Sequence, residues 1–205
     1  MGGTVYHLDK KKYLSFIIIL LMYSNFIWSN TMVIDDMKNS NSIVEQKDYC
    51  EENTTRWCFV TDKVMGGVSE GNLEIKYDNG FSYYNMQGNV STENNGGFIQ
   101  FRTQIKGHPE NKLFKGIRIK VRGNNEKYAI HLRTKYLFFP WQYYESIFTA
   151  DNNWKIIDIP LSSFKKSNFY QPSEISSIDI NTIGVVAIGR DFKADIDLAF
   201  IELTE

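Results

Sequence analysis

Residues 72–87 read NLEIKYDNGFSYYNMQ, two runs of strand-forming residues on either side of a turn. Asn79 and Gly80 tolerate the positive φ angles that a tight turn requires, and Asp-Asn-Gly between aromatic and β-branched residues is strong hairpin chemistry. We therefore predict that 72–77 and 81–87 form a β-hairpin.

Seven further runs rich in Phe, Tyr, Ile and Val lie between Gly97 and the C-terminus, separated by turns that contain Gly and Asn. They span 97–105, 116–123, 127–135, 143–149, 154–160, 183–189 and 195–203. Gly123-Asn124-Asn125 predicts a second hairpin between 116–123 and 127–135. No run has the periodicity of a helix of three or more turns. Many short strands with regular turn signals predict an all-β sandwich or barrel.

Alternation within three of these runs predicts which side chains face the core. The inward set is apolar: Ile99, Phe101, Ile105, Ile117, Ile119, Val121, Tyr128, Ile130 and Leu132. The opposite side carries Arg102, Arg118 and Arg133, so we predict that three neighbouring strands share one basic face. Two interpretations stay open for it: a solvated outer face, or a platform for an anionic or hydroxyl-rich ligand or an acidic partner.

The densest aromatic run is YLFFPWQYY (136–144), which Pro140 divides. One interpretation is core plus a packed loop, because large aromatic rings dominate β-sandwich interiors. In the other, Trp141 and Tyr143 are platforms for a sugar or anchors for a protein partner, and Gln142 and Arg133 supply orienting hydrogen bonds. The predicted binding residues are then Arg102, Arg118, Arg133, Trp141, Gln142 and Tyr143.

Two blocks contain paired glycines: WCFVTDKVMGGVSEG (57–71) and GNVSTENNGGFIQFR (88–102). A phosphate-binding loop needs a helix N-terminus behind it, and neither a helix nor a Lys-Ser/Thr pair follows Gly66-Gly67. We expect a tight turn or bulge instead, with Asp62 and Ser69 bonding to backbone N–H groups. The segment 94–97 is a tight turn or, alternatively, a ligand-facing loop.

Residues 1–29 have the pattern of a targeting segment. Lys10-Lys11-Lys12 precede an apolar stretch at 13–28 and small or polar residues follow, as in a secretory signal peptide. The uninterrupted apolar core is short for a bilayer span of about 20 residues. Cleavage is therefore the favoured interpretation over an uncleaved signal anchor, in which 13–28 would be the membrane contact. A mitochondrial transit peptide is amphipathic and Arg-rich, which this segment is not.

Residues 30–56 are predicted to be an N-terminal arm and loop, with a candidate first strand at 32–37, and 57–205 to be one domain. Without 1–29 the chain holds 20 basic and 23 acidic side chains, a balance that does not indicate nucleic-acid binding. Cys50 and Cys58 form either a small disulfide loop in an oxidising compartment or two buried thiols. No histidine lies near them, so we predict no zinc site.

Little in the sequence supports an active site. Ser69, His131 and Asp62 can be combined as a catalytic triad, but no nucleophile elbow or oxyanion loop accompanies them. We predict no catalytic residue, no metal ligand and no cofactor, and a protein that binds rather than catalyses.

The two glycine blocks resemble signatures of the complex I intermediate-associated protein 30 family. The matching residues are Trp57, Asp62, Met65, Gly66, Gly67, Ser69, Asn95, Gly96, Gly97 and Phe98. The runs IRIKVRG (117–123), WKIIDIPLSSF (154–164), IGVVAIG (183–189) and DIDLAFIEL (195–203) are similar to its later strands. The resemblance extends from Val33 to the C-terminus.

This resemblance implies a galactose-binding-domain-like jelly-roll sandwich, in agreement with the strand pattern. Mitochondrial members are chaperones that bind an assembly intermediate of respiratory complex I, which implies a protein partner here, including a membrane-complex intermediate. A glycan or small ligand is the alternative, and no nucleic acid is expected. The export pattern departs from a mitochondrial setting, so we expect the bacterial periplasm or, without cleavage, a membrane-anchored protein.

Overall fold

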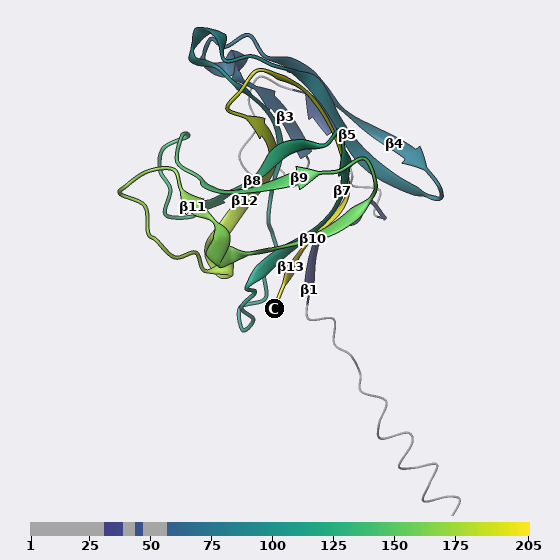
Figure 1. The fold of residues 1–205 in the computed structure, drawn as a ribbon. Helices are drawn as coiled ribbons and strands as arrows, with labels where there is room; N and C mark the ends of the chain where they lie inside the picture. The colour runs from purple at the N-terminus through teal and green to yellow at the C-terminus, as the bar shows by residue number, and fades with distance from the viewer. Residues whose placement is uncertain (1–30, 39–43, 47–56) are drawn as a thin grey trace, which may run out of the picture. The chain divides into compact units, whose positions relative to one another are not determined.

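The computed structural model describes residues 31–38, 44–46 and 57–205, and for 44–46 the chain path alone (Figure 1). The targeting segment predicted at 1–29 lies outside the described residues, and so does Cys50. Cys58 is buried, and no described cysteine is a free thiol; the Cys50–Cys58 pairing stays a prediction. Within the described ranges, no helix is long and apolar enough to cross a membrane.

The described strands form two sheets that sandwich one core, which confirms the predicted all-β class. The first sheet runs β10 (Lys155–Pro160), β7 (Gly116–Gly123), β13 (Phe192–Thr204), β5 (Phe81–Val90) and β4 (Glu70–Asp78), with β1 (Thr31–Asp35) beside β13. The second sheet runs β11 (Lys165–Lys166), β9 (Tyr144–Ala150), β8 (Glu126–Thr134), β12 (Ile180–Ile188), β6 (Phe98–Gln104), β3 (Trp57–Thr61) and β2 (Val44–Gln46). β2 pairs in parallel with β3, and the other pairings are antiparallel. Helical structure in the described residues is limited to short 3₁₀ turns at Asp62–Met65, Glu93–Asn95, Leu161–Ser163 and Ser177–Asp179.

The predicted hairpin at 72–87 is confirmed. β4 and β5 pair antiparallel, and Asp78 lies opposite Phe81. Asn79 and Gly80 between them have φ angles of 50° and 89°. Both central residues therefore adopt the left-handed conformation that closes a two-residue hairpin turn.

The core is built from the alternating apolar side chains of both sheets. Eight of the nine predicted inward residues are almost completely buried, and Ile105 is partly buried against them. Trp57, Tyr84 and Phe101 form an aromatic cluster with ring centroids 5.0–6.1 Å apart. Each large apolar side chain buried in this way contributes about 1.5–3 kcal/mol to folding.

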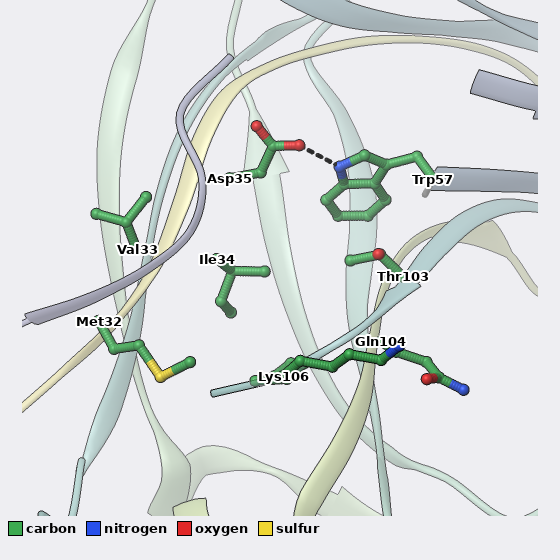
Figure 2. A pocket seen from close by; sticks show the side chains of 9 residues that line it. Met32, Val33, Ile34, Asp35, Trp57, Thr103, Gln104 and Lys106 are labelled. Carbon is green, nitrogen blue, oxygen red and sulfur yellow. Dashed lines mark hydrogen bonds between the residues drawn. The ribbon is translucent and has the colours of Figure 1, made fainter. Parts of the chain in front are cut away.

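One partly buried carboxylate joins the two sheets to the β1 edge strand. Oδ2 of Asp35 accepts hydrogen bonds from Nε1 of Trp57 on β3 and from the hydroxyl of Tyr84 on β5, each at 2.7 Å. Figure 2 shows Asp35 and Trp57 at one end of a small cavity, with Met32 and Lys106 at the other. Its volume of about 90 Å³ holds about three waters, far less than a typical ligand site.

The predicted hairpin between 116–123 and 127–135 is wrong. β7 pairs with β10 and β13 in the first sheet, whereas β8 pairs with β9 and β12 in the second. The turn at Gly123 carries the chain from one sheet to the other, and a Cβ on Gly123 would lie 2.7 Å from the Ala150 side chain. Turn residues specify a change of chain direction, but tertiary packing selects the sheet that receives the next strand.

The basic face predicted for three neighbouring strands is wrong for the same reason. Arg118 lies on β7 in the first sheet, where its guanidinium pairs with Asp158 at 2.7 Å and Glu202 at 3.5 Å. Arg102 and Arg133 lie on β6 and β8 of the second sheet, on either side of β12. The predicted residues therefore belong to two faces of the sandwich.

Candidate binding surface

The residues of the first glycine block surround the side chain of Asp62. This carboxylate is completely buried at the end of β3. It accepts hydrogen bonds from the backbone N–H of Ser69 at 2.9 Å, from the Ser69 hydroxyl at 2.6 Å, and from the backbone N–H groups of Gly97 and Phe98. Burial alone would raise the pKa of Asp62, but these hydrogen bonds outweigh it and hold the pKa below its ordinary value.

Two glycines are required because they pack against this carboxylate. A Cβ on Gly67 would lie 2.3 Å from Cγ of Asp62, and one on Gly96 would lie 2.4 Å from Oδ2. Gly66 and Gly97 have φ angles of 90° and 124°, which favour glycine. Both glycine blocks therefore wrap an internal anion, an arrangement that fits a structural role better than phosphate binding.

Met65 and Asn95, the remaining loop residues of the two motifs, are exposed. His131 does not join Asp62 and Ser69. Its Nε2 lies 3.0 Å from a carboxylate oxygen of Glu145 on the adjacent strand β9. The triad that can be written from the sequence is therefore divided between two separate hydrogen-bonded groups.

Polar and aromatic side chains form a row across the outer face of the second sheet. The strand register places Arg102, Gly184, His131 and Glu145 opposite one another on four consecutive strands. The ring of Tyr143 stacks on His131, with centroids 4.0 Å apart and planes inclined by 10°. The hydrogen bond from His131 lowers the pKa of Glu145, and burial lowers the pKa of Arg102.

Arg133, two residues beyond His131 on β8, holds the loop 135–143 from inside. Its Nη1 donates to the carbonyl oxygens of Phe139, Pro140 and Gln142 at 2.7–2.9 Å, and its Nη2 donates to that of Leu137 at 3.2 Å. Burial, followed by the nearby charge of Arg102, lowers the pKa of Arg133.

The side chain of Gln142 is also buried and turned inward. Its Oε1 accepts hydrogen bonds from the backbone N–H groups of Phe138 and Phe139 at 3.1 and 3.0 Å. The hydrogen-bonding groups that we predicted would orient a ligand are therefore used to shape the loop.

As a result, the loop presents aromatic rings to solvent. The exposed fractions of Phe138 and Trp141 are 85% and 62%, and Tyr136 and Phe139 are each half exposed. Phe139 and Trp141 stack, with centroids 4.9 Å apart and planes inclined by 11°. The interpretation of 136–144 as core and packed loop holds for the buried Leu137 and Tyr144, but not for these four rings.

A second loop extends the same surface. Phe169 and Tyr170 are more than 80% exposed. The loop is joined to Tyr143 by hydrogen bonds of 2.9–3.0 Å involving Ser167 and Gln171. We call the exposed rings of the two loops the aromatic rim: Tyr136, Phe138, Phe139, Trp141, Phe169 and Tyr170.

Of the rim, the sequence-based prediction included only Trp141. Phe138 and Phe139 sit beside Pro140, and Phe169 and Tyr170 follow Asn168 and precede Pro172, so these pairs lie in turn segments without strand alternation. Large aromatic residues in predicted turns, rather than on a strand face, were the sequence signal that could have identified these exposed rings.

Three solved structures with the same fold are carbohydrate-binding modules. The family 11 module of the cellulosomal cellulase Lic26A-Cel5E of Clostridium thermocellum has a TM-score of 0.62 and 16% identity, over 86% of this chain and 95% of that chain. A family 11 module from the same organism in complex with a β-1,3-1,4-mixed-linked tetrasaccharide has a TM-score of 0.61 and 16% identity, over 86% and 96%. A family 4 carbohydrate-binding module has a TM-score of 0.50 and 14% identity, over 83% of this chain and 99% of that chain. At such identities the likeness establishes the fold, a jelly-roll β-sandwich, as predicted.

The family is established by sequence. Residues 45–199 match the family described as Complex I intermediate-associated protein 30. The chain belongs to this family, which confirms the resemblance stated above. No curated protein sequence matches the chain.

Proposed function

We propose that this chain is a non-enzymatic binding protein that captures a protein partner on the aromatic rim, as an assembly factor or chaperone does. The observation that carries the proposal is the set of six exposed rings on two loops joined by hydrogen bonds. Aromatic residues are typical anchors of protein interfaces, and loops already held in place lose little conformational entropy on binding.

The direction of the polar groups favours a protein over a sugar as the occupant of the rim. A saccharide site combines aromatic rings with polar groups that converge on the ligand. Here Arg133 and Gln142 turn their hydrogen-bonding groups toward the backbone of their own loop. What the two loops expose is a set of six aromatic rings, as in a surface that meets another macromolecule.

The family name supports a partner that is an assembly intermediate. The targeting pattern of residues 1–29 supports an extracytoplasmic location, so the proposed partner is an intermediate of a membrane complex that is accessible from that side. The pair Cys50 and Cys58 is compatible with an oxidising compartment.

A second candidate function is glycan binding on the outer face of the second sheet. The specific observation in its favour is two stacked ring pairs, Phe139 with Trp141 and His131 with Tyr143. Arg102 lies in register with His131, two strands away on the same sheet. The fold relative in complex with a tetrasaccharide makes this candidate worth testing in parallel.

Site-specific photo-crosslinking tests the first function. Phe138 is replaced by p-benzoylphenylalanine, the full chain is irradiated with native membranes, and adducts are identified by mass spectrometry. We expect adducts with a subunit of a membrane complex, lost when Trp141→Ala is added. The matched control places the same probe at Tyr77, which is 73% exposed on β4 of the other sheet. Equal adducts from both positions, or saturable glycan binding that Trp141→Ala abolishes without any adduct, would reject the protein-capture function.

A further inference from the structure

A polar pocket lies on the outer face of the first sheet, which is distinct from the sheet that carries the aromatic rim. Its volume is about 370 Å³, within the range of small-molecule sites. β4, β5, β13 and β7 lie side by side and contribute Lys76, Tyr83, Asn85, Gln87, Asp195 and Arg122 to its lining. None of these residues belongs to the predicted or proposed binding surface.

The floor of the pocket is a hydrogen-bonded network centred on Asn85. Nδ2 of Asn85 donates to Oδ1 of Asp197 at 2.7 Å and to Oδ1 of Asp195 at 3.0 Å, and Oδ1 of Asn85 accepts from Nζ of Lys76 at 2.6 Å. Arg122 donates to Oδ2 of Asp197 through Nε at 2.8 Å and pairs with it through Nη2 at 2.7 Å. Asn85 and Asp197 are more than nine-tenths buried. The side chains that form the floor are therefore held in place before any ligand arrives.

Several polar atoms of the network can form further hydrogen bonds. Asp195 accepts from Asn85 and from Gln87 on the same oxygen, Oδ1, and within the described residues its Oδ2 has no hydrogen-bond partner. The amide oxygen of Gln87 likewise has no hydrogen-bond partner within the described residues. The ammonium group of Lys76 uses one of its three donors on Asn85. The pocket thus offers both acceptors and donors.

The charges and their arrangement select against ions. Lys76 and Arg122 balance Asp195 and Asp197, so the lining has no excess of either sign. The amide hydrogens of Asn85 already point at both carboxylates, where a cation would have to sit. An anion would approach the same two carboxylates and be repelled.

We propose that this pocket binds a neutral, hydroxyl-rich small molecule, a monosaccharide or disaccharide. A hydroxyl group both donates and accepts hydrogen bonds. It can therefore donate to the carboxylate of Asp195 and the amide oxygen of Gln87, and accept from the ammonium group of Lys76. The ring of Tyr83 also lines the pocket, with the guanidinium carbon of Arg122 5.4 Å from the ring centroid, so an aromatic group lies beside the polar ones. This site goes beyond protein capture by the rim and uses the opposite sheet.

The test is an NMR titration of the ¹⁵N-labelled full chain with cellobiose, observed at the side-chain amide groups of Asn85 and Gln87. We expect saturable shifts of both signals. Asp195→Asn removes the acceptor charge without changing the side-chain size and is expected to weaken binding about tenfold. Val64→Ala, at an exposed residue that belongs neither to the pocket nor to the aromatic rim, is expected to leave the affinity unchanged. Gln87→Ala serves as a second variant, expected to weaken binding several-fold, in case Asp195→Asn does not fold.

Three outcomes would overturn the proposal. Cellobiose could leave the amide signals of Asn85 and Gln87 in place, or shift only signals of the rim loops. Sodium phosphate or calcium chloride could shift the pocket signals more than cellobiose does, which would identify an ion site. The affinity could remain the same in folded Asp195→Asn and Gln87→Ala. Shifts confined to the rim loops would favour the glycan candidate for the rim, whereas the other outcomes leave photo-crosslinking at Phe138 unaffected, so the two proposals fail separately.

Discussion

Nη1 of Arg133 donates to the backbone carbonyl oxygen of Gln142 at 2.7 Å, and the side chain of Gln142 accepts from two backbone N–H groups of the same loop. Two polar side chains at the second sheet thereby use their hydrogen bonds on the loop interior. Because the polar atoms point inward, the aromatic rings of the loop point outward. An arginine on a strand therefore shapes a neighbouring surface that it does not itself present.

Arg133→Lys should disorder the loop, although the charge is kept. An ammonium group cannot reach four carbonyl oxygens in the fixed geometry of a guanidinium group, and hydrogen bonds to charged groups contribute about 1.5–3 kcal/mol each. We expect a lower free energy of unfolding by about 2–3 kcal/mol, with faster hydrogen exchange at the amides of Phe138 and Phe139. The matched control is Arg118→Lys on the first sheet, whose nearer partner, Asp158, is exposed, and it should change both measurements much less. Equal effects of the two variants would contradict this role for Arg133.

Asp62→Asn should destabilise the fold strongly. An amide nitrogen in place of one carboxylate oxygen turns a donor toward N–H groups that already donate, and it removes the charge from a fully buried acceptor. We expect a loss of about 3 kcal/mol in the free energy of unfolding at neutral pH, measured by urea denaturation.

The same variant should change the pH dependence of stability. The pKa of Asp62 is lower in the folded state than the ordinary value of 3.8, so the unfolded state binds more protons in the window between the two values. The stabilisation by the carboxylate is complete above the ordinary pKa and is lost as the pH falls through the folded pKa. The stability difference between wild type and Asp62→Asn should therefore shrink at acidic pH. A difference that stays constant down to pH values well below 3.8 would contradict this prediction.

Gly67→Ala should cost more than an alanine at a glycine that lies in open space. A Cβ at Gly67 would overlap the Asp62 carboxylate, which has no room to move. We expect a loss of about 3 kcal/mol or more in the free energy of unfolding. Gly80→Ala in the β4–β5 turn is the control: nothing lies within 4 Å of its Cβ position, and only the positive φ is strained, at about 1–2 kcal/mol. Thermal denaturation of both variants gives the comparison, and the reverse order of midpoints would exclude the overlap at Asp62.

His131→Phe should raise the pKa of Glu145. The hydrogen bond from His131 is the main cause of the lowered pKa, and burial acts in the opposite direction. Without the imidazole the burial remains, so the pKa should move above its ordinary value of 4.5. A ¹³C NMR titration of the Glu145 carboxyl measures this, and His131→Gln, which retains a hydrogen-bond donor, should move the pKa less. An unchanged pKa in His131→Phe would show that another group controls Glu145.

The sequence alone determined most of the strands, the inward face of three of them, the β4–β5 turn and the family. These properties depend on neighbours along the chain: alternation orients successive side chains, and Asn79 with Gly80 permits the turn by its own backbone preferences. The residues around Asp62 were also accessible from the sequence, because paired glycines with nearby Asp and Ser indicate a turn bonded to a side chain.

Only the tertiary structure decided which sheet each strand joins and where each polar side chain is used. Gly123 predicts a turn equally well within a sheet or between sheets, and the packing against Ala150 placed Arg118 on the far side from Arg133. In the same way, local sequence cannot show that Arg133 binds loop carbonyls, or that no described residue donates a hydrogen bond to Oδ2 of Asp195 in the pocket. Both depend on groups brought together from distant strands, because hydrogen bonds and burial are set by proximity in space rather than by order along the chain.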